Sequence, residues 1–237
     1  QNDFTIVYVA DKTHSFSAGT HTIYVGGNFT NDDTFDAGTG KVVFNATTAG
    51  HTIKTNGDEF YDVEWNGSGG EWALQDEFTG SHSNTFTLGT IILSTWGDYN
   101  CGIEDSAVVL GNGFTIDLGS NGGFGNGYGS LTVPTGAAIV SSDGGYLRLE
   151  NGGLTVSGTG VITYSGSGWF LIIGDITINT SNVGFDLGNL TIVQAMSPGS
   201  ANISSNKPLY NYTVGCGYET SGIHLTSDLV VLNDVTV

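Results

Sequence analysis

Carboxylates are the side chains of this protein best suited to chemistry. Among the 23 carboxylates are three adjacent pairs of one Asp with one Glu, Asp58/Glu59, Asp76/Glu77 and Glu104/Asp105. Glycoside hydrolysis uses two carboxyl groups held at a set separation on either side of a glycosidic bond. Adjacent residues of a strand point to opposite faces, so neither member of such a pair can face its neighbour across one substrate. We therefore predict no catalytic residues, and a polysaccharide-active enzyme is the least favoured function.

Cationic groups are too few for the other common chemistry on acidic polysaccharides. A lyase needs a cation to neutralise the uronate and a base to remove a proton. The whole chain has only five basic residues, Lys12, Lys41, Lys54, Arg148 and Lys207. A hydrolase-type Gly-X-Ser-X-Gly nucleophile turn is also missing from the sequence. We expect a protein that is not an enzyme and has no organic cofactor.

Hard oxygen ligands gather in two Gly-flanked segments. The candidates for calcium are Asp32, Asp33 and Asp36 in the first segment and Asp58 and Glu59 in the second. Calcium is bound by carboxylate and carbonyl oxygens, but neither segment has the spacing of an EF-hand loop. Asp and Asn are also favoured in turns without any metal. Calcium is thus the one ion for which the sequence offers candidates.

The cysteines and the N-glycosylation sequons both bear on whether the protein is exported from the cytoplasm. The two cysteines, Cys101 and Cys216, are 115 residues apart. Three states remain open: a disulfide formed through a loop that folds back, a bridge between subunits, or two free buried thiols. Asn-X-Ser/Thr sequons, the acceptor pattern for glycans in exported proteins, occur at Asn28, Asn45, Asn66, Asn179, Asn189, Asn202 and Asn211.

Charge excludes some partners. Five Lys and Arg against 23 Asp and Glu give a formal net charge of −18. Such a surface repels phosphate backbones and anionic lipid, so we expect neither nucleic-acid binding nor membrane insertion. The sequence also lacks a run of about 18 apolar residues. Because it opens on Gln1 without a leader pattern, we expect a processed protein located outside the cell or at its surface.

The elements that must position these groups are short strands. Glycine (38 residues) and Asn/Asp clusters separate brief alternating segments, and the single helical pattern, 71–78, is too weak to predict a helix. Strands are expected at 4–9, 21–25, 41–45, 51–55, 60–65, 85–88, 90–95, 107–110, 146–149, 161–164, 169–173, 183–187, 209–213, 222–225, 229–232 and 234–237.

An apolar-Thr-apolar triplet recurs between these strands. It occurs at 114–116, 131–133, 154–156, 176–178 and 190–192, with central threonines 17, 23, 22 and 14 residues apart. In a strand the two apolar residues point one way and the threonine the other. Return of the same pattern in the same direction about every 20 residues favours a β-solenoid, with a β-sandwich as the alternative.

The regularity of the pattern divides the chain into two parts. Residues 1–112 are expected to form irregular solenoid coils with protruding loops. Residues 113–237 are expected to form more regular coils, continuous with the first part.

Two segments carry a family resemblance. Residues 24–45, YVGGNFTNDDTFDAGTGKVVFN, are similar to the "GGNFTN…TFNAGTGTVTFNG" repeats of large bacterial and archaeal cell-surface proteins, and 51–55 with 60–66 resemble the continuation of those repeats. The resemblance covers about forty residues clearly. It implies a secreted, right-handed parallel β-helix in an adhesin or surface-layer setting, and it implies no chemistry.

These observations predict a structural role. We expect a subunit of an extracellular filament or surface layer, a homopolymer joined through terminal strand edges at Phe4, Ile6, Tyr8, Leu229, Val231, Val235 and Val237. The alternative is an adhesin fragment that binds polysaccharide through exposed aromatic rings. Its candidates are Trp65, Trp72, Trp96, Tyr99, Tyr128 and Trp169.

Overall fold

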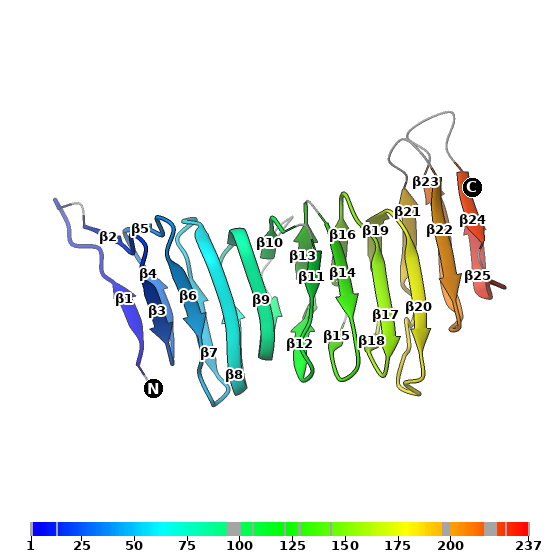
Figure 1. The fold of residues 1–237 in the computed structure, drawn as a ribbon, viewed down its shortest axis with the longest axis horizontal. Helices are drawn as coiled ribbons and strands as arrows, with labels where there is room; N and C mark the ends of the chain where they lie inside the picture. The colour runs from blue at the N-terminus through cyan, green and yellow to red at the C-terminus, as the bar shows by residue number, and fades with distance from the viewer. Residues whose placement is uncertain are drawn as a thin grey trace.

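The protein is an all-β parallel solenoid of about nine turns, as predicted. The computed structural model describes residues 2–12, 14–93, 101–105, 107–120, 122–127, 129–142, 144–195, 200–215, 222–225 and 227–236. Within these residues 62% of the structure is strand and there is no helix. Figure 1 shows an elongated stack in which the chain advances from one end to the other.

Each coil visits three faces in the same order, which we call faces I, II and III. Face I contains β1 (Phe4–Ile6), β4 (Phe29–Asn31), β7 (His51–Lys54), β12 (Phe114–Asp117), β15 (Ala138–Ser141) and β18 (Val161–Tyr164). Face II contains β2 (Ser15–Ser17), β5 (Thr34–Asp36), β10 (Cys101–Ile103), β13 (Gly123–Asn126), β16 (Tyr146–Leu149), β19 (Trp169–Ile173), β21 (Thr191–Ala195), β23 (Leu209–Gly215) and β25 (Val231–Thr236). Face III contains β3 (Thr22–Val25), β6 (Lys41–Phe44), β11 (Ala107–Val109), β14 (Ser130–Val133), β17 (Leu154–Gly158), β20 (Ile176–Thr180), β22 (Ser200–Ser205) and β24 (Gly222–Leu225).

Two long strands run around the corners of the solenoid. β8 (Phe60–Leu74) and β9 (Phe78–Leu93) each pass from face II through face III to face I. β9 then pairs with both β10 and β12, so the ladders of the N-terminal coils continue into those of the C-terminal coils. All named strand pairs of the described residues are parallel, and Val9 and Lys12 form an isolated antiparallel bridge.

The core consists of columns of equivalent residues stacked coil on coil. On face III, one inward column contains Val25, Phe44, Trp65, Phe86 and Leu110, all of them buried. On face II, the inward column contains Phe78, Cys101, Phe124, Leu147, Phe170, Ile192, Tyr212 and Val235. Each column is a continuous apolar wall, and burial of such surface is the main favourable term in folding.

The threonine triplets belong to three different faces. Thr132, Thr155 and Thr177 are in register on face III, whereas Thr115 lies on face I and Thr191 on face II. The first and last spacings between the threonines are the shortest because at those steps the triplet changes face. Positions that stay on one face, such as the three threonines of face III, are separated by a whole coil each time.

The N-terminal coils are shorter than the central ones. The steps along the chain from Val25 to Phe44 and from Phe44 to Trp65, which are aligned core residues, are both shorter than the step from Phe124 to Leu147. Aromatic rings fill the N-terminal coils: Phe44 stacks on Trp65 with ring centroids 4.6 Å apart, and Phe60 stacks on Phe78 at 4.9 Å.

Several expected strands have different bounds in the structure. The strand expected at 60–65 continues to Leu74 in β8, and those expected at 85–88 and 90–95 are joined, over the described residues, in β9. The strand expected at 4–9 ends at Ile6 in β1, and the one expected at 229–232 is replaced by β25. The segment 183–187 contains only an isolated bridge from Asp186 to Thr163. This coil crosses face I without a strand: Val183 is 99% exposed, whereas Leu187 at the end of the same segment is buried in the core.

The coils pack so closely that a side chain at some glycine positions would clash with the backbone of the neighbouring coil. A Cβ atom at Gly153 would lie 2.1 Å from the carbonyl oxygen of Asp175 in the next coil, whereas a Cβ at Gly127 would meet nothing within 4 Å. We predict that Gly153→Ala lowers the free energy of unfolding by about 2–4 kcal/mol because backbone must move to relieve the clash. Gly127→Ala, the control, should change it by less than about 0.5 kcal/mol. Chemical denaturation of both variants measures the difference, and equal losses would contradict the coil spacing.

Candidate functional site

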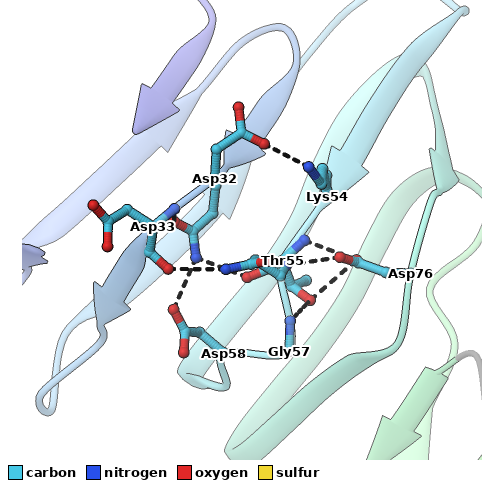
Figure 2. Close-up of polar contacts among 9 residues, drawn as sticks. Asp32, Asp33, Lys54, Thr55, Gly57, Asp58 and Asp76 are labelled. Atoms are coloured by element: carbon cyan, nitrogen blue, oxygen red, sulfur yellow. Dashed lines mark hydrogen bonds and ion pairs between the residues drawn. The ribbon is translucent and has the colours of Figure 1, made fainter. Parts of the chain in front are cut away.

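The aspartates at the corners of the coils bind backbone and buried polar groups. The Asp58 carboxylate accepts a hydrogen bond from the Asn31 side-chain nitrogen at 2.8 Å (Figure 2). It accepts a second from the Phe35 backbone N–H at 2.7 Å. Asn31 is fully buried and also donates to the Thr55 carbonyl at 2.7 Å. This carboxylate therefore satisfies donors that would otherwise be buried without partners.

The same arrangement recurs one coil later. Asp76 accepts from the Thr55 N–H at 2.8 Å, the Thr55 hydroxyl at 3.0 Å and the Asn56 N–H at 2.7 Å (Figure 2). Further along, Asp105 accepts from the Asn84 N–H at 3.0 Å. Carboxylates bonded to backbone N–H groups form the stronger, charge-assisted class of hydrogen bond.

The three carboxylate pairs are thus split between two environments. The aspartate of each pair accepts a hydrogen bond from a backbone N–H at a corner between two faces, whereas the glutamate is exposed. The aspartates are Asp58, Asp76 and Asp105, and the glutamates are Glu59, Glu77 and Glu104. Within each pair the two groups have different surroundings, although all six residues lie in the segments between strands and not within strands, where alternation was expected to separate them.

The remaining calcium candidates have internal partners too. Asp32 pairs with Lys54 at 2.5 Å, and this contact raises the pKa of the Lys54 ammonium. Asp33 accepts from the His14 backbone N–H at 2.7 Å. Asp36 accepts from the Ser17 hydroxyl and the Gly38 N–H, and these hydrogen bonds lower the pKa of the Asp36 carboxyl.

Metal ligands do not converge in the part of the chain that the structure describes, since it contains no group of three or more His, Cys, Asp or Glu side chains placed to hold an ion. The four aspartates among the calcium candidates have partners within the protein: Asp33, Asp36 and Asp58 accept hydrogen bonds, and Asp32 forms an ion pair. Glu59, the fifth candidate, lies exposed at the surface.

Cys101 lies in the face II core and forms no disulfide with any described residue. It is fully buried between Phe78 and Phe124, and burial raises the pKa of its thiol. Cys216, the other cysteine, lies outside the described residues. The pairing of Cys101 with Cys216 stays a prediction.

Five of the seven sequons have an exposed asparagine, at Asn45, Asn66, Asn179, Asn189 and Asn202. Asn28 and Asn211 are partly buried. The Asn28 side-chain oxygen also accepts from the Thr52 N–H at 2.9 Å. Glycan attachment is therefore sterically best served at the five exposed positions.

Two of the aromatic residues proposed to bind sugars are core residues instead. Trp65 and Trp72 are fully buried, because both belong to inward columns. Trp169 is 42% exposed and stacks on Tyr146 with ring centroids 5.2 Å apart. The other three candidates, Trp96, Tyr99 and Tyr128, lie outside the described residues.

The inward columns end uncovered at the C-terminal end of the solenoid. Leu225 follows Ile203 in a face III column and is 62% exposed, although Ile203 is fully buried. Val235 follows the buried Tyr212 on face II and is 54% exposed. Both side chains occupy core positions with no described coil on their outer side.

The N-terminal end has an uncovered column as well. Phe16 of β2 stacks on the buried Phe35 with ring centroids 6.2 Å apart and is 40% exposed. Most of the exposed large apolar side chains of the described residues belong to the two end coils: Val7, Tyr8, Val9, Phe16 and Tyr24 at one end, and Leu225, Val230, Leu232 and Val235 at the other. The apolar surface of this protein is concentrated at its ends.

The predicted assembly residues lie in or beside these end coils. Phe4 and Ile6 are in β1, Tyr8 is exposed just beyond it, Leu229 and Val231 pack partly against the core, and Val235 is exposed. Val237 lies outside the described residues. The sequence did not identify Phe16 and Leu225, because only the register between coils shows that they end inward columns.

Comparisons with family models, with curated proteins and with solved structures find no match to this chain. In the described residues no helix has the length and apolarity needed to cross a membrane.

The hydrogen bonds of the corner carboxylates predict how substitutions change the free energy of unfolding. Replacing Asp58 with Ala removes the acceptor of the Asn31 and Phe35 donors, and we predict a loss of about 1–3 kcal/mol in the free energy of unfolding. Glu59→Ala, the adjacent exposed carboxylate, is the matched control and should change it by less than about 0.5 kcal/mol. Equal effects in chemical denaturation would show that the corner network is not structural.

Proposed function

We propose that this protein is a structural, non-enzymatic subunit of an extracellular filament or surface layer, and that copies stack end to end. The observation that supports this proposal is the exposure of core positions at both ends, at Phe16 on one side and Leu225 and Val235 on the other. Buried apolar surface contributes about 25 cal/mol per Å², so these ends favour an apolar partner surface.

The strands at the two ends suit such stacking. β2 and β3 form the N-terminal edges of faces II and III, and β25 and β24 form the C-terminal edges of the same faces. Translation along the solenoid axis would lay β25 of one copy on β2 of the next, and β24 on β3, with all strands parallel. Unpaired strand edges are templates for such addition. A head-to-tail contact of this kind does not close on itself, so it builds a filament.

Charge would confine association to the ends. The net charge of −18 makes lateral approach of two copies unfavourable, whereas the end coils carry the exposed apolar side chains. The exposed sequons are in keeping with an extracellular location.

A carbohydrate-binding adhesin is the second candidate function. One observation favours it: the exposed Trp169 ring stacks on Tyr146 on the outer side of face II, where a sugar ring could extend the stack.

End-to-end assembly predicts the effect of a charge at the end of a column. The purified chain should form linear particles by negative-stain electron microscopy and sediment as oligomers. Val235→Lys should shift it to monomer because a buried lysine in the joint would have no partner. Val183→Lys adds the same charge at an exposed site between the ends and should assemble normally. A wild-type chain that stays monomeric at every concentration would contradict the proposal.

A further inference from the structure

A groove opens on the outer side of face II. Its volume is about 470 Å³, within the range typical of small-molecule sites. Its lining includes Thr79, Gly102, Gly125, Gly127 and Arg148, together with Glu77, Glu104 and Glu150.

The groove exists because one outward column lacks side chains on two successive coils. The aligned residues are Thr79, Gly102, Gly125 and Arg148. With adjacent parallel strands about 4.8 Å apart, the interval from Thr79 to Arg148 is roughly 14 Å. Gly127 widens this gap, because it lies beside Gly125 on the outer surface, between the coils of Glu104 and Glu150.

The backbone does not require glycine at Gly102 or at Gly127. A Cβ atom at Gly102 would make only ordinary contacts, the nearest at 3.8 Å, and a Cβ at Gly127 would meet nothing within 4 Å. Neither residue has a positive φ. Glycine within a strand is unfavourable by roughly 0.5–1 kcal/mol relative to alanine, and it often marks a place where a ligand approaches the backbone.

The walls of the groove combine acceptors with one planar donor. Arg148 forms an ion pair with Glu150, and Glu77 and Glu104 add two exposed carboxylates. Three carboxylates and one guanidinium leave a net negative charge, so the groove disfavours anionic ligands such as uronates, sulfates and phosphates. Carboxylates and a guanidinium together suit vicinal hydroxyl groups, which both donate and accept hydrogen bonds.

An aromatic stack lies along β16 from Arg148, one of the residues that line the groove. Tyr146 precedes Arg148 by two residues on β16 and so lies on the same outward side. Its ring covers Gly123, where a Cβ would lie 2.0 Å from the ring, and the exposed Trp169 stacks on its other side. Aromatic faces pack against the C–H faces of sugar rings, while the adjoining polar groups bind the hydroxyls.

We propose that this groove binds an oligosaccharide segment of uncharged sugars, with Arg148, Glu104 and Glu150 contacting hydroxyls over the glycine floor and Trp169 stacking on a neighbouring ring. The inference rests on the second candidate function, carbohydrate binding, and is independent of assembly because the groove lies on the side of the solenoid.

The test is native affinity electrophoresis of the full chain in gels that contain starch, β-glucan, galactomannan or xylan, with polygalacturonate as the anionic polymer. At least one neutral polysaccharide should retard the wild type, and polygalacturonate should not. Gly102→Val fills the groove and should abolish the retardation, while its thermal midpoint stays at or above that of the wild type because valine favours strands. Trp169→Ala should weaken binding about two- to tenfold.

Thr177→Val, an outward substitution on face III, is the matched control and should bind as the wild type does. If Gly102→Val still binds a neutral polysaccharide, the groove assignment is wrong although carbohydrate binding stands. If no neutral polymer retards the wild type, both are wrong. If polygalacturonate retards it, the assignment of the groove to uncharged sugars is wrong although carbohydrate binding stands. Gly102→Val should assemble like the wild type, so failure here is distinguishable from failure of end-to-end stacking.

Discussion

Registered stacking of one coil on the next is the constraint on which the rest of this structure depends. Each strand hydrogen-bonds to its equivalents in the neighbouring coils, so every residue lies directly above and below a partner about 4.8 Å away. A position is therefore inward or outward for a whole column, as the face III series from Val25 to Leu110 shows. A column can change its residue type from coil to coil, but it cannot change sides without breaking the ladder.

At the corners, the turns between two faces, stacking leaves backbone polar groups buried inside the solenoid. Strand ladders satisfy the backbone on the faces, but the turns between faces need other partners. Buried residues such as Asn31 and Thr180 supply them, the latter donating to the Gly160 carbonyl at 2.6 Å. The aspartates that first suggested metal or catalytic chemistry are part of this system. The oxygens of Asp58, Asp76 and Asp105 accept hydrogen bonds from the neighbouring coil, and the glutamates beside them are exposed.

Function in such a molecule is expected where columns are interrupted. Along the sides, an interruption is a missing side chain, and two glycines in one column open the groove beside Arg148. At the C-terminal end, Leu225 and Val235 continue inward columns but have no described coil on their outer side and are exposed. The two proposals therefore have a common physical origin but concern different surfaces, so one can fail without the other.

The sequence by itself determined the fold class, the position of most strands and the side on which most residues lie. These follow from alternation, a local property that repeats at every second residue, and the triplet threonines indeed face away from the core. The tertiary structure alone decided which residues share a column. Register depends on coil length, and the coil from Val25 to Phe44 is much shorter than the coil from Ile176 to Ile203, so the spacing of the triplets did not show that they lie on three faces. For the same reason Gly102 and Gly125, which are distant in the chain, resemble ordinary turn glycines until the coils bring them together.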